Sequence, residues 1–172
     1  LNARLNFGSG STRARIYERH QMPDEAFQRI LSTLRASGLE PCSGETLSAQ
    51  LGVSRAQIWK NISQLRKRGY TIEGSPGGGY QLIQSPDRLY PEEIKSDLKT
   101  EWLAQEIVYL EQTESTNQDA ARLARQGAAH GVTVIAESQT AGRGRLGRDF
   151  YSPAHQNIYT SIVLRPNLTM VE

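Results

Sequence analysis

Three arginines separated by glycines occur in the stretch "AGRGRLGR", residues 141–148. Their planar, permanently charged guanidinium groups match the oxygens of a carboxylate or a phosphate. Glycine lets backbone N–H groups approach a ligand closely. The pattern therefore predicts a loop that captures an anion and becomes ordered when the anion binds. A basic patch for nucleic acid is the competing interpretation of the same arginines.

The same stretch contains G-x-G-x-x-G at residues 142–147, a pattern typical of dinucleotide-binding turns. Such a turn needs a helix that begins at the glycines, so that the pyrophosphate meets its free N–H groups. Pro153 disfavours a continuing helix, and residues 157–164 have the composition of a strand. No carboxylate except Glu172 stands about twenty residues further on, where the ribose anchor would lie. These residues argue against a dinucleotide site.

A second polar stretch, "TESTNQDA" at residues 113–120, connects a predicted strand over residues 107–110 to a predicted helix. Ser115 and Gln118 have the spacing of a capping box, and Gly127 is suited to end the helix. The stretch is therefore expected to position polar side chains at the start of a helix.

Strands are also expected at residues 132–136 and 157–164, with the arginine loop between them. The order strand, helix, strand, loop, strand implies a mixed α/β domain whose sheet packs on helices. A predominantly helical region precedes this domain, so the expected fold class of the whole chain is α+β.

That helical region is basic over residues 54–68, which carry five Lys/Arg and no acidic residue, although the net charge of the 172-residue chain is only +2. Apolar spacing predicts three helices, over residues 23–37, 43–51 and 54–68. Gly52 provides a tight turn between the second and third helices. The arrangement is that of a helix-turn-helix.

Burial of the apolar face of the third helix leaves polar side chains exposed at its start, where such helices read DNA bases. Arginine and glutamine can bind base edges, and lysine binds phosphates. A short helical hairpin in an unrelated domain is the alternative interpretation. The residues expected to contact DNA are Ser54, Arg55, Gln57, Trp59 and Lys60.

Two short strands are expected at residues 70–73 and 80–82, around the glycine-rich turn at 74–79. A hairpin directly after the recognition helix favours a winged helix-turn-helix domain, at residues 22–84. Two prolines mark the expected linker at residues 85–92.

The mixed α/β domain is then expected at residues 93–172. Residues 1–21 lack periodicity and begin with leucine, so we interpret them as a disordered or non-native extension. Met22 is the expected natural start. The charge changes along the chain, from +2 over residues 22–84 to −5 over residues 85–139.

Composition excludes several classes of protein. The hydrophobic content of 37% is compatible with ordinary folded cores, and the single Cys42 allows no intrachain disulfide. One cysteine and three scattered histidines do not make a metal site. No apolar run is long enough for a signal peptide or a membrane span. A cytoplasmic protein without a membrane partner is expected.

Four stretches together resemble a known family: "SPGGGYQL", "TESTNQDA", "AESQTAGRGRLGRDFYSP" and "NIYTSIVLRP". They closely resemble the bacterial biotin protein ligases that double as biotin operon repressors, over residues 24–168. The resemblance implies that the second domain is the first part of a ligase-type domain, similar to class II synthetases. It also implies roles for particular residues, because the motifs align with the family's ligand site.

By that resemblance, Ser115, Thr116 and Asn117 line the biotin site. Gln139 would hydrogen-bond the ureido group of biotin and the groups beside it. The loop that closes over biotin and its adenylate would contain Gly142, Arg143, Gly144 and Arg145.

The resemblance implies two-step chemistry. Biotin and ATP, with Mg²⁺, form biotinyl-5′-AMP, and the biotin is then transferred to a lysine of the biotin carboxyl carrier protein of acetyl-CoA carboxylase. The adenylate would act as corepressor, favouring a homodimer that binds the operator DNA of biotin genes. No permanently bound cofactor is expected. The alternative is a non-catalytic winged-helix regulator that senses a small anionic ligand.

The chain departs from the family in two places. It stops at Glu172, before the family's lysine-bearing motif, so the sequence is expected to be a fragment with no certain catalytic residue and incomplete ligase activity. Gly78 stands where the family's wing tip usually has a lysine. The loss of that cation is expected to weaken DNA binding.

Overall fold

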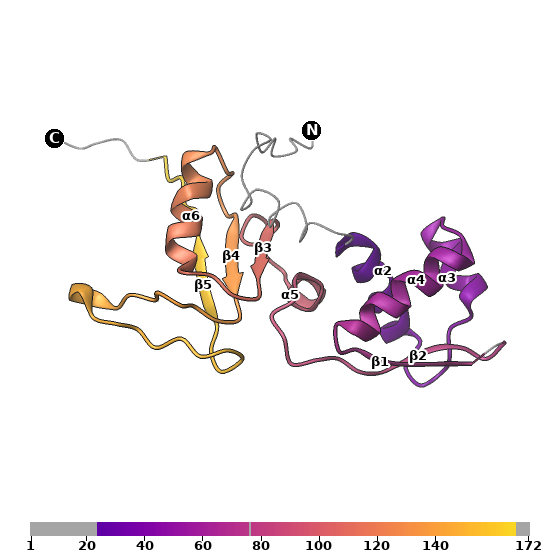
Figure 1. The fold of residues 1–172 in the computed structure, drawn as a ribbon. Helices are drawn as coiled ribbons and strands as arrows, with labels where there is room; N and C mark the ends of the chain where they lie inside the picture. The colour runs from indigo at the N-terminus through magenta and orange to yellow at the C-terminus, as the bar shows by residue number, and fades with distance from the viewer. Residues whose placement is uncertain (1–23, 76, 168–172) are drawn as a thin grey trace. The chain divides into compact units, whose positions relative to one another are not determined.

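The computed structural model of the protein describes residues 24–75 and 77–167, which divide into two compact units (Figure 1). The first, here called the winged-helix unit, comprises residues 24–88 and Glu92–Asp97. The second, here called the sheet unit, comprises Leu89–Pro91 and residues 98–167. Helices dominate one unit and a sheet with one helix the other, which confirms the expected α+β class. The predicted extension at residues 1–21 and the predicted start at Met22 lie outside the described residues.

Three helices form the winged-helix unit: α2 (Asp24–Ala36), α3 (Gly44–Leu51) and α4 (Arg55–Lys67). Serines begin the second and third of them. Ser43 Oγ accepts a hydrogen bond from the Thr46 N–H at 2.9 Å, and Ser54 Oγ caps α4 in the same way. These caps satisfy N–H groups that have no partner within the helix, which explains where the helices begin.

The turn between α3 and α4 depends on Gly52, whose φ of +68° lies in the left-handed region. Apolar side chains of all three helices meet behind this turn and are shielded from water, which is the main source of the unit's stability. The largest of them are Ile30, Leu31, Leu34, Leu47, Ile58, Ile62 and Leu65.

The wing is an antiparallel hairpin of β1 (Thr71–Ser75) and β2 (Gly79–Gln84), longer than the two strands expected from the sequence. Its second strand begins at a glycine because of close backbone packing. A Cβ at Gly79 would lie 2.7 Å from the Cys42 carbonyl oxygen, and its φ is +84°. Cys42 itself pairs with Tyr80 in an isolated antiparallel bridge, which ties the wing to the start of α3.

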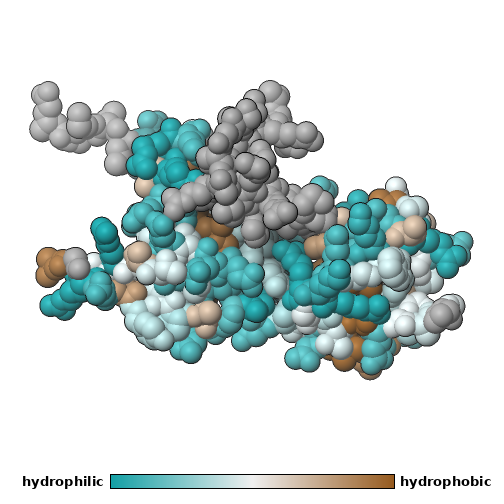
Figure 2. All heavy atoms as spheres, viewed as in Figure 1, coloured by the Kyte–Doolittle hydropathy of each residue, from teal (hydrophilic) through white to brown (hydrophobic). Residues whose placement is uncertain are grey.

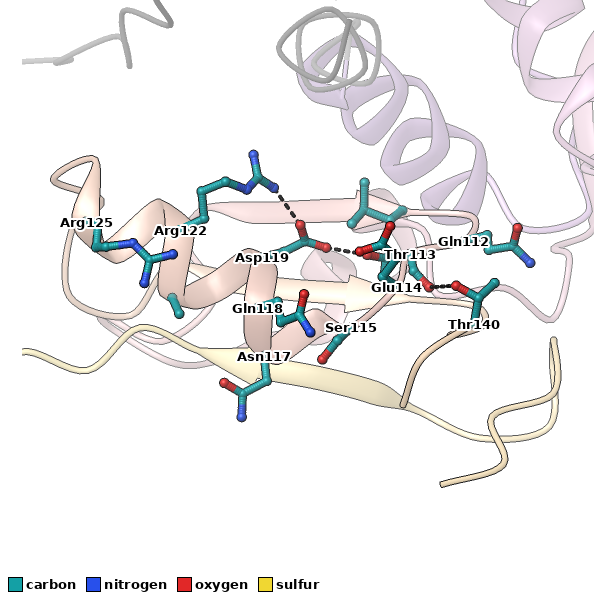
Figure 3. A pocket seen from close by; sticks show the side chains of 12 residues that line it. Gln112, Thr113, Glu114, Ser115, Asn117, Gln118, Asp119, Arg122, Arg125 and Thr140 are labelled. Atoms are coloured by element: carbon teal, nitrogen blue, oxygen red, sulfur yellow. Dashed lines mark hydrogen bonds and ion pairs between the residues drawn. The ribbon is translucent and has the colours of Figure 1, made fainter. Parts of the chain in front are cut away.

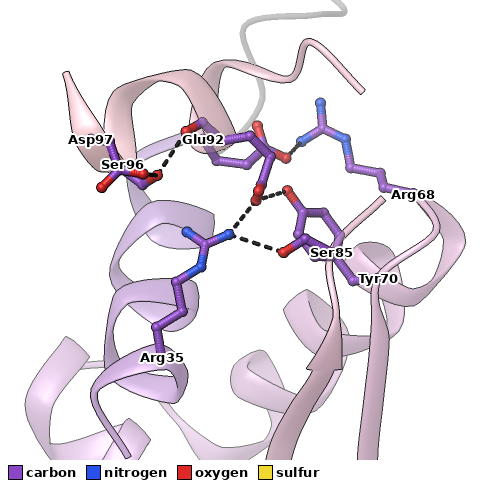
Figure 4. Close-up of polar contacts among 8 residues, drawn as sticks. Arg35, Arg68, Tyr70, Ser85, Glu92, Ser96 and Asp97 are labelled. Atoms are coloured by element: carbon purple, nitrogen blue, oxygen red, sulfur yellow. Dashed lines mark hydrogen bonds and ion pairs between the residues drawn. The ribbon is translucent and has the colours of Figure 1, made fainter. Parts of the chain in front are cut away.

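Helix α5 (Pro91–Asp97) begins within the predicted linker, and Glu92–Asp97 group with the winged-helix unit. The buried carboxylate of Glu92 lies 2.6 Å from Arg68 Nη1, and Arg68 directly follows α4 (Figure 4). The Arg68 guanidinium also lies 5.3 Å from the centre of the Phe27 ring. Arg68, at the end of α4, therefore contacts both α5 and α2.

A second acidic residue of α5 adds to this attachment. Glu93 Oε1 accepts hydrogen bonds from Arg35 Nη2 at 2.6 Å and from the Tyr70 hydroxyl at 2.7 Å (Figure 4). Burial, followed by the hydrogen bond to Glu93, raises the pKa of Tyr70 well above its usual value. The hydroxyl therefore stays protonated and continues to donate.

The sheet unit contains strands β3 (Ile107–Leu110), β4 (Thr133–Ala136) and β5 (Tyr159–Ile162) in the spatial order β3-β4-β5. β4 runs parallel to β3 and antiparallel to β5, and all its residues are buried. Helix α6 (Thr116–Arg125) connects β3 to β4 and packs on β4 and β5. Its inward residues Ala120 and Leu123 join the core of the sheet.

These elements confirm the predicted strand over residues 107–110. The strands expected at 132–136 and 157–164 are present but shorter. Between them, the only helical turn is a 3-10 turn at Arg145–Gly147, and extended backbone follows it at Arg148. Since no helix begins at the glycines, the geometry agrees with the sequence argument against a dinucleotide-binding turn.

Candidate functional site

The Ser-Thr-Asn stretch lies where β3 leads into α6. Ser115 is the residue before the first turn of the helix, but its side chain makes no capping hydrogen bond. The predicted capping box with Gln118 is therefore wrong. The Thr116 N–H donates instead to Gln139 Oε1, at 2.9 Å, so a distant amide does the work that a local cap would do.

Gln139 is the centre of a polar network. Its Oε1 also accepts from the Thr116 hydroxyl at 3.2 Å, and its Nε2 donates to Ser152 Oγ at 3.2 Å. The Thr116 hydroxyl lies 3.0 Å from Ser161 Oγ, on β5. The network joins four segments that are far apart in sequence. Sequence reasoning missed Ser152 and Ser161, since only the pairing of strands brings them to Thr116 and Gln139.

Backbone pairing explains why Gln139 lies opposite the Ser-Thr-Asn stretch. The parallel ladder of β3 and β4 continues beyond both strands, through an isolated bridge between Thr113 and Gln139. The Thr113 N–H donates to the Ser138 carbonyl at 3.1 Å, and the Thr140 N–H donates to the Thr113 carbonyl at 2.9 Å. The two polar stretches singled out in the sequence therefore lie side by side.

A pocket of about 530 Å³ lies against the first turns of α6 (Figure 3). Ser115 and Asn117 line it, as the resemblance implies for a biotin site. Its charged wall includes Asp119, which lies 2.5 Å from Arg122 Nη2 and also accepts from the Thr113 hydroxyl. The other lining residues are Leu110, Gln112, Glu114, Gln118, Ala121, Arg125 and Thr140.

The glycine loop begins against the same network. Gly142 is buried, and a Cβ there would lie 2.7 Å from the Phe150 carbonyl oxygen, 2.7 Å from Ser152 Oγ and 3.2 Å from Gln139 Nε2. The first two distances are shorter than real side chains adopt, so this position requires glycine. Gly142 therefore allows the loop to leave the sheet directly beneath the Gln139 amide.

Arg143 and Arg145 are exposed and do not line the pocket beside α6. Backbone pairing of Arg143 with Asp149 forms the base of the loop, and Gly144 lies between the two arginines. At the tip, Leu146 is 94% exposed with a φ of +61° (Figure 2, where the tip is brown). The structure thus unites Thr116, Gln139 and Gly142 but leaves the two arginines directed to solvent.

The residues predicted to contact DNA lie at the start of α4. Arg55, Trp59 and Lys60 are exposed, with Trp59 63% exposed. Gln57 is half-buried and donates from Nε2 to Asn61 Oδ1 at 2.9 Å. Ser54 accepts from the Gln57 N–H at 3.2 Å, so in this structure it acts as a helix cap.

The start of α4 and the wing enclose a groove of about 620 Å³. Arg55, Trp59 and Arg66 line it from the helix, and Arg66 Nε donates to the Ile72 carbonyl of the wing at 2.8 Å. An exposed aromatic ring between guanidinium groups suits contact with both bases and phosphates. The remaining lining residues are Ser43, Gly44, Glu45, Ala56, Gly74, Ser75, Gly77, Gly79 and Tyr80.

Two absences hold for the described part of the chain. No group of three or more His, Cys, Asp or Glu side chains there is placed to hold a metal ion. No helix among residues 24–75 and 77–167 is both long and apolar enough to cross a membrane.

Comparison with known families finds one match in each unit. Residues 28–81 match the family described as "HTH domain", and residues 109–172 match the "Biotin/lipoate A/B protein ligase family". Part of each unit is therefore similar to one of these two families. The first match covers α2 to the wing, and the second covers the Ser-Thr-Asn stretch, Gln139 and the arginine loop.

Several curated proteins are similar to this chain. The "Bifunctional ligase/repressor BirA" of Bacillus spizizenii is 39% identical over 82% of this chain, and that of Escherichia coli is 39% identical over 84%. A "Biotin--[acetyl-CoA-carboxylase] ligase" of Mycobacterium tuberculosis is 38% identical over 46% of this chain. The matched residues span 43% of the length of each of the first two proteins and 32% of the third.

Proposed function

Because the chain joins an HTH domain to a domain of the biotin/lipoate A/B protein ligase family, we propose that it is part of a biotin protein ligase that also represses biotin genes. The observation that carries the proposal is the meeting of Thr116, Gln139 and Gly142 beside the pocket that Ser115 and Asn117 line. The proposed domains are those expected from the sequence, at residues 22–84 and 93–172.

Biotin and ATP are the proposed substrates. Ser115 and Asn117 offer a hydroxyl and an amide, which can pair with the donors and acceptors of a ureido group. The internal hydrogen bonds of Gln139 hold the first turn of α6 in place. A ligand that pairs with the Gln139 amide exchanges those bonds for its own.

In the first proposed step, a carboxylate oxygen of biotin attacks the α-phosphorus of ATP, and the bond to pyrophosphate breaks. Both reactants are anionic, so their repulsion must be screened. Arg143 and Arg145 supply positive charge on a loop that can fold over the reacting groups. Mg²⁺ would bind the ATP phosphates, whose oxygens are its preferred ligands.

In the second step, a lysine amine of the biotin carboxyl carrier protein attacks the carbonyl carbon of the adenylate. AMP leaves and the amine loses a proton. A mixed anhydride is hydrolysed rapidly by water, so a closed loop preserves the intermediate until the carrier binds.

For repression, we propose that the adenylate favours a homodimer whose two winged-helix units bind two half-sites of operator DNA. Arg55, Trp59 and Lys60 are the exposed side chains proposed to contact that DNA, with Gln57 reaching a base edge after release from Asn61. We also propose a cytoplasmic location, where ATP and the carrier protein are available.

The competing proposal is a regulator that binds a small anionic ligand without catalysis. The two proposals differ in whether the protein forms pyrophosphate from ATP. Exchange of labelled pyrophosphate into ATP, measured on the full-length product of the gene, should require biotin if adenylation occurs. Biotin binding without exchange supports the regulator. A protein that shows no biotin binding and no exchange contradicts both proposals.

A further inference from the structure

Glu137 directly follows β4 and is 1% exposed. Its Oε1 accepts hydrogen bonds from the Leu89 N–H at 2.9 Å and from the Tyr109 hydroxyl at 3.1 Å. Its Oε2 lies 3.0 Å from His155 Nδ1. One buried carboxylate therefore contacts three separate segments of the sheet unit.

Each of those segments has a distinct place in the unit. Leu89 begins the stretch Leu89–Pro91, through which the chain enters the sheet unit. Tyr109 belongs to β3. His155 lies between the arginine loop and β5, at the opposite end of the loop from Gly142.

The contact with His155 involves backbone as well as side chain. His155 has a φ of +60°, which side-chain-bearing residues rarely adopt. Its N–H donates to the Glu137 carbonyl at 3.2 Å while its ring faces the Glu137 carboxylate. Glu137 therefore holds both the position and the unusual conformation of the returning end of the loop.

The donors to Glu137 suit an ionised carboxylate. Burial, followed by the charge of Glu137, raises the pKa of Tyr109 well above its usual value, so its hydroxyl stays protonated and donates. A buried charge is costly, and apolar packing would stabilise the fold at least as well. A charge retained here therefore indicates a role in holding specific segments together.

We propose that Glu137 is a positioning residue that joins the returning end of the arginine loop to Leu89–Pro91. Ligand binding at the loop then changes the hydrogen bonding of Leu89–Pro91, where the chain enters the sheet unit. This inference rests on the proposed function, because it names a regulatory connection from the same ligand site. When the loop closes over biotin or its adenylate, His155 moves and shifts the Glu137 carboxylate. The Leu89 N–H, which donates to that carboxylate, then changes its protection from hydrogen exchange.

The test is hydrogen exchange of the Leu89 amide in the full-length protein, with and without biotin, ATP and Mg²⁺. In the wild type, ligand should slow this exchange. His155→Ala should abolish most of the slowing and should release the adenylate roughly tenfold faster, the size of one lost charge-assisted hydrogen bond. Gln156→Ala, an exposed neighbour, is the matched control and should behave as the wild type.

A wild type that binds ligand without any change at Leu89, or a His155→Ala protein that keeps the full change, overturns the proposal. Failure of the proposed function is recognised separately, because the wild type would then bind neither biotin nor adenylate. Without ligand, Glu137→Gln should still speed exchange at both Leu89 and His155 by about tenfold. Unchanged exchange at either amide refutes the connection whatever the ligand.

Discussion

The two units use their candidate binding residues in different ways. In the winged-helix unit, Arg55, Trp59 and Lys60 are exposed, and the core behind them is apolar. In the sheet unit, Thr116 and Gln139 are part of the hydrogen-bond network that holds α6 to the sheet. We therefore expect substitutions at the exposed residues of the winged-helix unit to leave its fold intact, and substitutions in the Thr116–Gln139 network to change the stability of the sheet unit.

Each unit also buries a glutamate, in a different electrostatic setting. Glu92 pairs with the cation of Arg68 in the winged-helix unit. Glu137 is held in the sheet unit by a backbone N–H, a hydroxyl and an imidazole. The first contact is an ion pair of 2.6 Å, so the loss of its cation should be severe. The second is distributed over three segments.

The largest effect is expected from Arg68→Met. The substitution removes the 2.6 Å ion pair between Arg68 and the buried Glu92 carboxylate, which should lower the free energy of unfolding of the winged-helix unit by about 3 kcal/mol. Urea denaturation followed by circular dichroism measures this loss. Lys67→Met, exposed on the preceding residue, is the control. A loss equal to that of the control would show that Glu92 does not depend on Arg68.

Arg145→Ala should depart from the contrast between the units, because Arg145, which we propose contacts the ligand, is as exposed as the residues proposed for DNA. We expect release of the adenylate to be about 100-fold faster, with unfolding unchanged, since the charge acts only on bound ligand. Stopped-flow release of the adenylate measures the rate. Arg148→Ala, exposed at the end of the same turn, provides the comparison. Equal effects of both changes would remove the specific role of Arg145.

Thr116→Val should show the linkage within the sheet unit. It removes the hydroxyl contacts with Gln139 and Ser161, so we expect a loss of about 1–2 kcal/mol in the free energy of unfolding together with weaker biotin binding. Denaturation and biotin titration on the same preparation measure both. Asn117→Ala, at an exposed pocket residue, should weaken binding alone. Weaker binding by Thr116→Val at unchanged stability would contradict the linkage.

The smallest effect is expected from Lys60→Ala. Loss of one phosphate contact should reduce DNA affinity about fivefold for every sequence and lower the slope of log affinity against log salt by about one. Unfolding should change by less than about 0.5 kcal/mol, because the side chain is exposed. Fluorescence anisotropy at several salt concentrations measures the slope. A sequence-dependent loss would instead assign Lys60 to a base.

The differences between the units also explain what could be predicted from the sequence. The helices of the winged-helix unit follow local rules, so Ser43, Ser54 and Gly52 mark their ends within a residue or two. In the sheet unit, the predicted capping box failed because Gln139 supplies the cap from another strand. Sequence spacing contains no signal for such a long-range hydrogen bond.

Other features could not be predicted for the same reason. Ser152 and Ser161 meet the network only through strand pairing, and their neighbours in sequence resemble ordinary loop and strand residues. Helix α5 is attached to the winged-helix unit through Glu92. In the sequence, nothing distinguishes Glu92 from the other acidic residues of its region. Motif and resemblance agree at Ser115 and Asn117, which line the pocket, and their contact with biotin stays a prediction.

We propose that the sheet unit binds biotin through the residues around Thr116 and Gln139. The most direct test is calorimetric titration of biotin into the full-length product of the gene, with and without ATP and Mg²⁺. We expect saturable heat at one biotin per chain and release of pyrophosphate when ATP is present. Folded protein that gives no heat with biotin under either condition would contradict it.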